Sequence, residues 1–257
     1  MRGRTVLAAA SVALVAGVLS APAAQADSKG DIRITKVVVN HGKNVVVGTS
    51  GRFTYPIAVT VKDNHGVKGL TRVSTFSRDH LLGFAAWTGT SCKETSATTS
   101  VCTATMTIDP AWAPVLTDKV NRVAGVWVVN ADAKAKDGDF CEGDGIASYK
   151  VKRASRLTID ATPQQVAKNG TLTVKGKLTR ANWETLKNPG FAGQTVRLQF
   201  KKSGTSSYST VKTVTTDSTG RLSAKVKITA SGTWRWSFSG TTTTAAGSST
   251  GNSVKLK

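Results

Sequence analysis

Hydrophobic and polar residues alternate along four stretches of the C-terminal half of this chain. In the clearest stretch, Leu222, Ala224 and Val226 alternate with Ser223 and Lys225. Successive side chains of a β-strand point to opposite faces of its sheet, so each stretch predicts a strand with one buried and one solvated face. The four stretches cover residues 172–178, 196–201, 221–228 and 234–238. Turns rich in Gly, Asn, Asp and Ser separate them, which favours a sandwich of two antiparallel sheets.

The N-terminal half shows the same alternation less regularly. Its candidate strands cover residues 32–39, 57–62, 70–76, 101–108, 123–131 and 147–151. Residues 132–145 are interpreted as a long acidic loop before the last of these strands, and the chain enters the second domain near Ser155. We therefore predict an all-β fold of two tandem Ig-like antiparallel β-sandwich domains, residues 27–155 and 156–257.

Residues 1–26 have the order of a secretory signal peptide. Arg2 and Arg4 give a positive start, Val6 to Leu19 is an uncharged apolar run, and small residues precede the expected cleavage after Ala26. A retained membrane anchor is the alternative, but the apolar run is shorter than the roughly 20 residues that span a bilayer. We expect a secreted, extracellular protein with no membrane span in the mature chain.

Three cysteines follow this segment. Cys92 and Cys102 flank a short polar turn, at a separation that suits a disulfide across a β-hairpin. Disulfides persist outside the cytoplasm, so this pair is expected to be bonded. Cys141 then remains as a free thiol, or alternatively links two chains.

Positive charge dominates the sequence and is concentrated in its C-terminal part. The full chain carries 35 basic and 15 acidic residues. Residues 27–156 hold 18 basic and 12 acidic residues, whereas residues 157–257 hold 15 basic and 3 acidic ones. Such a field attracts polyanions, and we expect an anionic cell-wall polymer or an acidic polysaccharide, without sequence-specific nucleic-acid recognition. The alternative is that the charge serves solubility alone.

Seven of the C-terminal cations occupy the outward phase of the predicted strands. If the strands are neighbours, these cations form rows that would bind a polyanion: Lys175, Lys177, Arg197, Lys201, Lys225, Lys227 and Arg235. Rows of charge also prevent the edges of sheets from pairing with other chains, which is the competing explanation.

Several segments together resemble a known kind of protein. They are residues 176–183, 196–200 and 231–236 with Gly220, then residues 42–49, the Cys92/Cys102 hairpin, and residues 125–127 with the acidic stretch that follows. These segments resemble secreted two-domain Ig-like proteins of Gram-positive soil bacteria of the actinobacterial type. Some proteins of that kind are described as calcium-binding, so the resemblance implies an Ig-like fold and suggests a calcium site.

The acidic stretch is the candidate for that site. Calcium takes about six to eight oxygen ligands, and glycines let a loop wrap around the ion. Lys134 and Lys136 stand where an EF-hand would supply oxygens, so the spacing is not that of an EF-hand. Ig-like loops at one end of a sandwich lie together, which adds a residue from the turn after the second strand. The expected ligands of Ca²⁺ are Asp63, Asp137, Asp139, Glu142 and Asp144. A solvated acidic loop that balances nearby lysines is the alternative.

Aromatic and histidine residues give little support to an enzyme. Trp234, Trp236 and Phe238 share one phase of a strand and are expected in the core, whereas Trp183 lies in a polar stretch and is the candidate for an exposed aromatic. No His-Glu-x-x-His or Cys-x-x-Cys spacing occurs. We expect a non-enzymatic binding or structural protein, associated with the cell wall through its charge. A calcium-binding protein is the first alternative, and an extracellular hydrolase with spatially paired carboxylates is the second.

Overall fold

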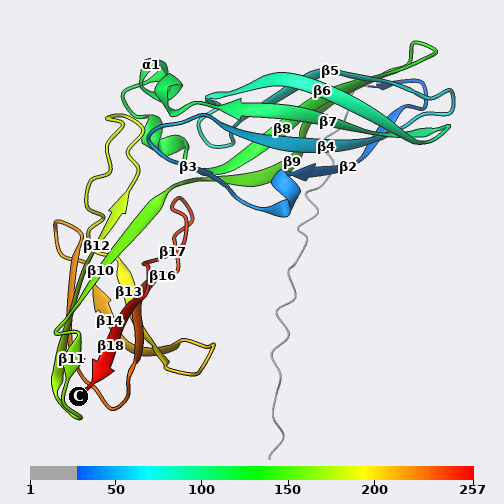
Figure 1. Ribbon diagram of the computed structural model, residues 1–257. Helices are drawn as coiled ribbons and strands as arrows, with labels where there is room; N and C mark the ends of the chain where they lie inside the picture. The colour runs from blue at the N-terminus through cyan, green and yellow to red at the C-terminus, as the bar shows by residue number, and fades with distance from the viewer. Residues whose placement is uncertain (1–27) are drawn as a thin grey trace, which may run out of the picture.

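The computed structural model describes residues 28–257, and the predicted signal peptide lies outside the described residues. Two β-sandwiches follow each other along the chain, as Figure 1 shows, and strand β9 (Phe140–Arg153) runs directly into strand β10 (Ser155–Thr162). All neighbouring long strands pair antiparallel, so the predicted all-β fold of two antiparallel sandwiches is confirmed. Across residues 28–257, no helix combines the length and the apolar character needed to cross a membrane.

The N-terminal sandwich packs a sheet ordered β1-β9-β8-β5, with β3 beside β9, against a sheet ordered β2-β4-β7-β6. Its strands are β1 (Ser28–Lys29), β2 (Arg33–Val39), β3 (Val45–Val47), β4 (Phe53–Lys62), β5 (Val67–Ser77), β6 (Ala85–Ser96), β7 (Thr99–Ile108), β8 (Gly125–Ala135) and β9. Short helical turns are η1 (Asn40–Gly42), η2 (Pro110–Trp112), α1 (Ala113–Leu116) and η3 (Val120–Val123).

Alternation of side chains builds the core between these two sheets. Ile57, Val59 and Val61 of β4 are fully buried, and Trp127 and Val129 of β8 face them from the other sheet. Cys92 of β6 and Cys102 of β7 lie directly opposite each other and form the predicted disulfide, while the thiol of Cys141 is free and buried.

The acidic stretch at residues 132–145 is wrongly predicted as a loop, because the structure forms a β-hairpin there. β8 continues to Ala135 and β9 starts at Phe140, so only four residues, 136–139, make the turn. Gly143 is a strand residue in which a Cβ atom would lie 2.9 Å from the carbonyl oxygen of Ala131. This glycine therefore permits close pairing of the hairpin rather than a flexible loop.

The C-terminal sandwich packs a sheet ordered β10-β12-β15 against one ordered β11-β18-β16-β13-β14, with β17 beside β16. Its strands are β10, β11 (Gln165–Val166), β12 (Thr171–Arg180), β13 (Thr195–Lys202), β14 (Ser209–Thr215), β15 (Arg221–Lys227), β16 (Gly232–Phe238), β17 (Gly247–Ser248) and β18 (Asn252–Leu256). Trp234, Trp236 and Phe238 are buried in the core, as predicted.

Trp183 is not an exposed aromatic; it is fully buried between the two sandwiches. It lies in the segment after β12 and packs its ring 5.1 Å from Phe84, which in turn lies 5.7 Å from Trp127 of the N-terminal core. Its indole nitrogen donates to the carbonyl of Val47 at 3.3 Å. Trp183 therefore anchors the C-terminal domain in the core of the N-terminal one. The polar residues around it in the sequence do not indicate that it is exposed.

Backbone and polar contacts surround this anchor. The Arg153 side chain is buried at the junction and donates to the carbonyl of Ala181 at 2.6 Å. Burial lowers the pKa of Arg153 to about 10. Asn121 of η3 accepts from the backbone of Trp183 and donates to Asn182. The two sandwiches thus share one packed and hydrogen-bonded junction.

Candidate functional site

Three aspartates from distant parts of the sequence meet at one end of the N-terminal sandwich. Asp31 precedes β2, Asp63 follows β4, and Asp139 ends the turn between β8 and β9. One carboxylate oxygen of each lies within 4.8 Å of the others. We call these three residues the carboxylate cluster. The sequence predicts Asp63 and Asp139 as members, but not Asp31.

Asp63 is the buried centre of the carboxylate cluster. Its side chain is only 2% exposed, and one oxygen, Oδ1, accepts the backbone N–H of His65 at 2.8 Å. The other oxygen, Oδ2, is buried and has no hydrogen-bond partner in the structure. A buried carboxylate oxygen without a partner is costly, because it has lost water and gained nothing in return. A bound cation would supply the missing partner.

A second trio shares Asp63. It adds Asp137 and His65, whose Nδ1 lies 2.8 Å from the carboxylate of Asp137. The carboxylate cluster, in contrast, offers only carboxylate oxygens. An all-oxygen set suits Ca²⁺ better than zinc, which favours nitrogen and sulfur.

The backbone at residue 30 is shaped to receive Asp139. Gly30 has φ of +84°, and a Cβ atom there would lie 1.4 Å from Asp139 Oδ2. The next residue, Asp31, donates its N–H to the same oxygen at 3.1 Å. Only glycine permits this close approach of a carboxylate to the chain.

Glu142 and Asp144, two further predicted calcium ligands, lie outside the carboxylate cluster. Asp144 accepts from Arg72 at 2.9 Å, and the same guanidinium donates to Asp132 at 2.7 and 2.9 Å. These hydrogen bonds raise the pKa of Arg72. Glu142 lies opposite Asp132 on the hairpin ladder. Both acids therefore belong to the paired strands rather than to the turn.

The seven predicted polyanion-binding residues divide between the two sheets of the C-terminal sandwich. Four lie on the outer face of β12 and β15, and Arg221 of β15 and Arg156 of the neighbouring β10 join them on the same face: Lys175, Lys177, Lys225, Lys227, Arg156 and Arg221. We call this set the cationic face. Asp160 is the acid on the same face, and it accepts from Thr162 rather than from a cation. The remaining three residues lie on the opposite sheet.

Those three, Arg197, Lys201 and Arg235, contact neighbouring side chains, and the Lys201 ammonium lies 5.3 Å from the ring centre of Tyr208. The guanidinium of Arg235 stacks 3.7 Å from the ring centre of Tyr208 and donates to Gln199 at 2.8 Å. Arg197 donates to the hydroxyl of Ser239. The structure therefore does not unite the seven residues into one surface.

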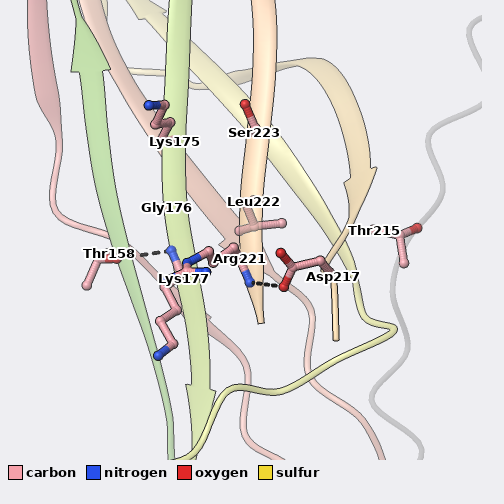
Figure 2. A pocket seen from close by; sticks show the side chains of 9 residues that line it. All are labelled: Thr158, Lys175, Gly176, Lys177, Thr215, Asp217, Arg221, Leu222 and Ser223. Carbon is pink, nitrogen blue, oxygen red and sulfur yellow. Dashed lines mark hydrogen bonds between the residues drawn. The ribbon is translucent and has the colours of Figure 1, made fainter. Parts of the chain in front are cut away.

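A groove of about 650 Å³ lies at one part of the cationic face, where Lys175, Lys177 and Arg221 line it together with Thr215 and Asp217. Figure 2 shows Lys175 and Ser223 side by side on β12 and β15, with Lys177 and Arg221 as the next pair along the strands. Thr158 of β10 accepts the backbone N–H of Lys177 at 3.0 Å. Cations alternating with hydroxyls are donors suited to phosphate or sulfate oxygens.

Asp217 is an acid that lines this groove without forming an ion pair. Asp217 Oδ1 accepts the backbone N–H groups of Thr219 and Arg221, each at 2.8 Å, and also the Thr219 hydroxyl. These bonds, that to Arg221 above all, lower the pKa of Asp217. Asp217 therefore stays ionised beside Arg221 at the edge of the groove. Within residues 157–257, all described, no ion pair forms.

Residues 247–251 match the letters of a hydrolase nucleophile motif, Gly-x-Ser-x-Gly. The central Ser249 is 7% exposed; its hydroxyl accepts from the backbone of Trp236 and donates to the carbonyl of Thr250. β18 follows at once, whereas that motif requires a strand-to-helix turn. Ser249 therefore has a structural role.

No protein-family model matches this chain, and no curated protein matches it. Among solved structures, the D00-D0 domain of intimin is 16% identical over 85% of this chain and 99% of that one, with a TM-score of 0.28. The Yersinia pseudotuberculosis adhesin InvE is 14% identical over 86% of this chain and 60% of its own, with a TM-score of 0.26. A putative membrane anchored protein from Corynebacterium diphtheriae is 12% identical over 90% of this chain and 53% of its own, with a TM-score of 0.28. The Ig-like sandwich fold itself rests on the sheets described above.

Proposed function

We propose that this protein is an extracellular, non-enzymatic binding protein that attaches to anionic polymers through the cationic face. The observation that carries this proposal is the unpaired charge of the C-terminal sandwich. Six cations share one outer sheet face with one acid, and the ion pairs of the described chain all lie in the other sandwich. Cations without acidic partners in the protein are free to bind anionic groups.

The geometry of the sheet supports a linear polymer as ligand. Residues two apart on a strand lie about 7 Å apart, and neighbouring strands lie about 5 Å apart, so the cations form a flat lattice. Lys175 and Lys177 on β12 lie beside Ser223 and Arg221 on β15 in this lattice. A chain of regularly spaced phosphate or sulfate groups could contact several cations at once. A cell-wall teichoic acid or an acidic polysaccharide has that form.

The test compares two variants with the same loss of charge in the same sandwich. One combines Lys175→Gln, Lys225→Gln and Lys227→Gln on the cationic face; the control combines Lys202→Gln, Lys212→Gln and Lys255→Gln on the opposite sheet. Affinity for purified teichoic acid and for dextran sulfate is measured by titration calorimetry, with neutral dextran as the blank. The first variant is expected to lose at least tenfold in affinity and the second much less. Equal losses would show that only net charge matters.

A second function, calcium binding by the carboxylate cluster, is favoured by the buried and unpartnered Oδ2 of Asp63. Asp31 and Asp139 complete the oxygen set, and water would supply the remaining ligands. Saturating calcium, at a hundred times its dissociation constant, should stabilise the protein by about 2.7 kcal/mol through mass action.

Two isosteric substitutions test this site. Asp63→Asn removes the central charge of the carboxylate cluster and should abolish both calcium binding in calorimetry and the thermal stabilisation. Glu142→Gln removes a neighbouring acid outside the carboxylate cluster and should leave both intact. If Glu142→Gln abolishes binding while Asp63→Asn does not, the site is in the wrong place.

A further inference from the structure

A histidine lies beside the carboxylate cluster and gives Asp63 a second set of neighbours. One ligand atom each of Asp63, His65 and Asp137 lies within 4.8 Å of the other two. We call these three residues the histidine trio. It shares only Asp63 with the carboxylate cluster, and it offers an imidazole nitrogen that the carboxylate cluster lacks. Zinc sites in proteins combine histidine nitrogen with carboxylate oxygen, whereas calcium takes oxygen ligands.

Backbone hydrogen bonds within and between two turns hold the histidine trio in place. Asp63 and His65 belong to the turn between β4 and β5, where Asp63 Oδ1 accepts the N–H of His65 at 2.8 Å. Asp137 belongs to the turn between β8 and β9. The two turns are joined because the N–H of Lys136 donates to the carbonyl of Gly66 at 2.9 Å. The three side chains are therefore brought together by the fold itself, as a preorganised site requires.

The spacing of the donor atoms suits a small cation. His65 Nδ1 lies 2.8 Å from Asp137 Oδ2. Two ligands of a tetrahedral zinc ion, each about 2.0–2.1 Å from the metal, lie about 3.3 Å apart. This pair therefore needs to separate by only about half an ångström to place an ion between its atoms. The buried Oδ2 of Asp63, which has no hydrogen-bond partner, would be the third ligand.

The charge at this end of the sandwich also favours a cation. Among residues 28–257, no lysine or arginine forms an ion pair with Asp63 or Asp137. Lys136, next to Asp137 in the turn, contacts Glu94 instead, at 2.6 Å. A metal ion would thus meet carboxylates that lysine and arginine leave unpaired, one of them buried.

We propose that the histidine trio binds a transition-metal ion of the zinc type, with one ligand from each residue and water in the fourth position. This site goes beyond the calcium function, because it needs neither Asp31 nor Asp139 and takes a different class of metal. Structural zinc sites are closed by four protein ligands, whereas a site with three keeps one position open. The side chain of His65 is 64% exposed, so the ion would exchange with the solution outside the cell.

Titration calorimetry with ZnCl₂ in calcium-free buffer tests the site, on the full chain purified without a histidine tag. His65→Gln should weaken zinc binding by at least about tenfold, because even a residue that only orients a ligand contributes about 10–100-fold to metal affinity. The exposed position of His65 means that this variant should fold as the unaltered protein does. His41→Gln is the matched control and should leave zinc binding intact. His41 is exposed in η1, beyond the end of β2 that lies away from Asp63.

A further variant separates the zinc site from the calcium site. Asp31→Asn should weaken calcium binding and leave zinc binding intact, because Asp31 belongs to the carboxylate cluster alone. His65→Gln should do the reverse. Equal zinc affinity in His65→Gln and the unaltered protein would overturn the histidine trio. Loss of zinc binding in Asp31→Asn or in His41→Gln would overturn it as well, because the ion would then lie elsewhere.

The histidine trio and the calcium function can fail independently. Zinc binding that depends on His65, in a protein that does not bind calcium, would support the histidine trio and overturn the calcium function. Calcium binding without zinc binding would overturn the histidine trio and leave the calcium function standing.

Discussion

Acidic and basic side chains bond to one another in the N-terminal sandwich, whereas in the C-terminal sandwich they do not. Arg72 bridges Asp132 and Asp144, and Lys136 contacts Glu94 at 2.6 Å. In the C-terminal sandwich, Asp217 accepts from backbone and hydroxyl groups of its own turn. The two domains share a fold but differ in their charges. The N-terminal domain pairs its charges internally, and the C-terminal domain presents cations to the solvent.

The two sandwiches also differ in what holds them together. The N-terminal one contains the disulfide and a buried pair of tyrosines, and it receives Trp183 from its neighbour. The C-terminal core is built from its own strands. Perturbations aimed at the disulfide, the tyrosines or Trp183 should therefore weaken the N-terminal sandwich selectively.

The largest effect is expected from Trp183→Ala. Removing a fully buried tryptophan costs about 3–5 kcal/mol, because the cavity left behind cannot collapse completely. Urea denaturation should show the N-terminal sandwich unfolding at lower urea, although the mutation lies in the other domain. Trp87→Ala, at a tryptophan 36% exposed on β6, is the control and should cost much less. Equal costs would show that Trp183 does not anchor the junction.

A smaller loss should follow from removing the disulfide. The bond closes a loop with a sequence separation of 10 residues. Opening a loop of that length through Cys92→Ser with Cys102→Ser should cost about 2–3 kcal/mol. Scanning calorimetry should show a lower melting temperature for the N-terminal sandwich alone. A matching decrease for the C-terminal sandwich would contradict the difference between them.

Just above pH 10, alkaline pH should produce the smallest stability change of the three. The hydroxyls of Tyr55 and Tyr149 lie 2.8 Å apart in the core, and burial raises the pKa of both. Their contribution is fully present below the ordinary tyrosine pKa of about 10 and is lost as the pH rises towards the folded values. Above about pH 10, each tyrosine should cost up to about 1.4 kcal/mol per pH unit.

Urea midpoints between pH 8 and pH 11, followed separately for the two sandwiches, measure this loss. Tyr149→Phe should reduce the pH dependence of the N-terminal sandwich, because one buried hydroxyl no longer needs its proton. If the pH dependence is unchanged in this variant, the tyrosine pair does not cause it.

Several strands with one buried face are predicted from the sequence, although β10, which also has one, is not, and an exposed strand such as β14 is not predicted either. β12, β13, β15 and β16 alternate clearly and were found. β14 is exposed along nearly its whole length, so it carries no alternating pattern. The β8–β9 hairpin was missed because Asp and Gly residues, which normally signal loops, occupy paired strand positions there.

The candidate sites were predictable where they depend on a single strand or turn. Asp137 and Asp139 stand out because they share one turn, and the phase of β12 and β15 identifies four of the cations. Asp31 and Trp183 take part in contacts between segments about 108 and 136 residues apart, and no local pattern reports such contacts. Pairing of Asp144 with Arg72 is likewise a property of the folded sheet.

The salt dependence of polymer binding is the most direct test of whether the C-terminal sandwich, and not the N-terminal one, presents its cations to an anionic polymer. Each cation that neutralises an anionic group releases counterions, so affinity falls with salt by a slope set by the number of contacts. Lys175→Gln with Lys225→Gln and Lys227→Gln should reduce the log–log slope for a phosphate polymer by about 2–3. The same change at Lys36, Lys43 and Lys68 of the N-terminal sandwich should leave the slope unaltered. Equal reductions in the two variants, or a flat response in the unaltered protein, would contradict a binding role for the cationic face.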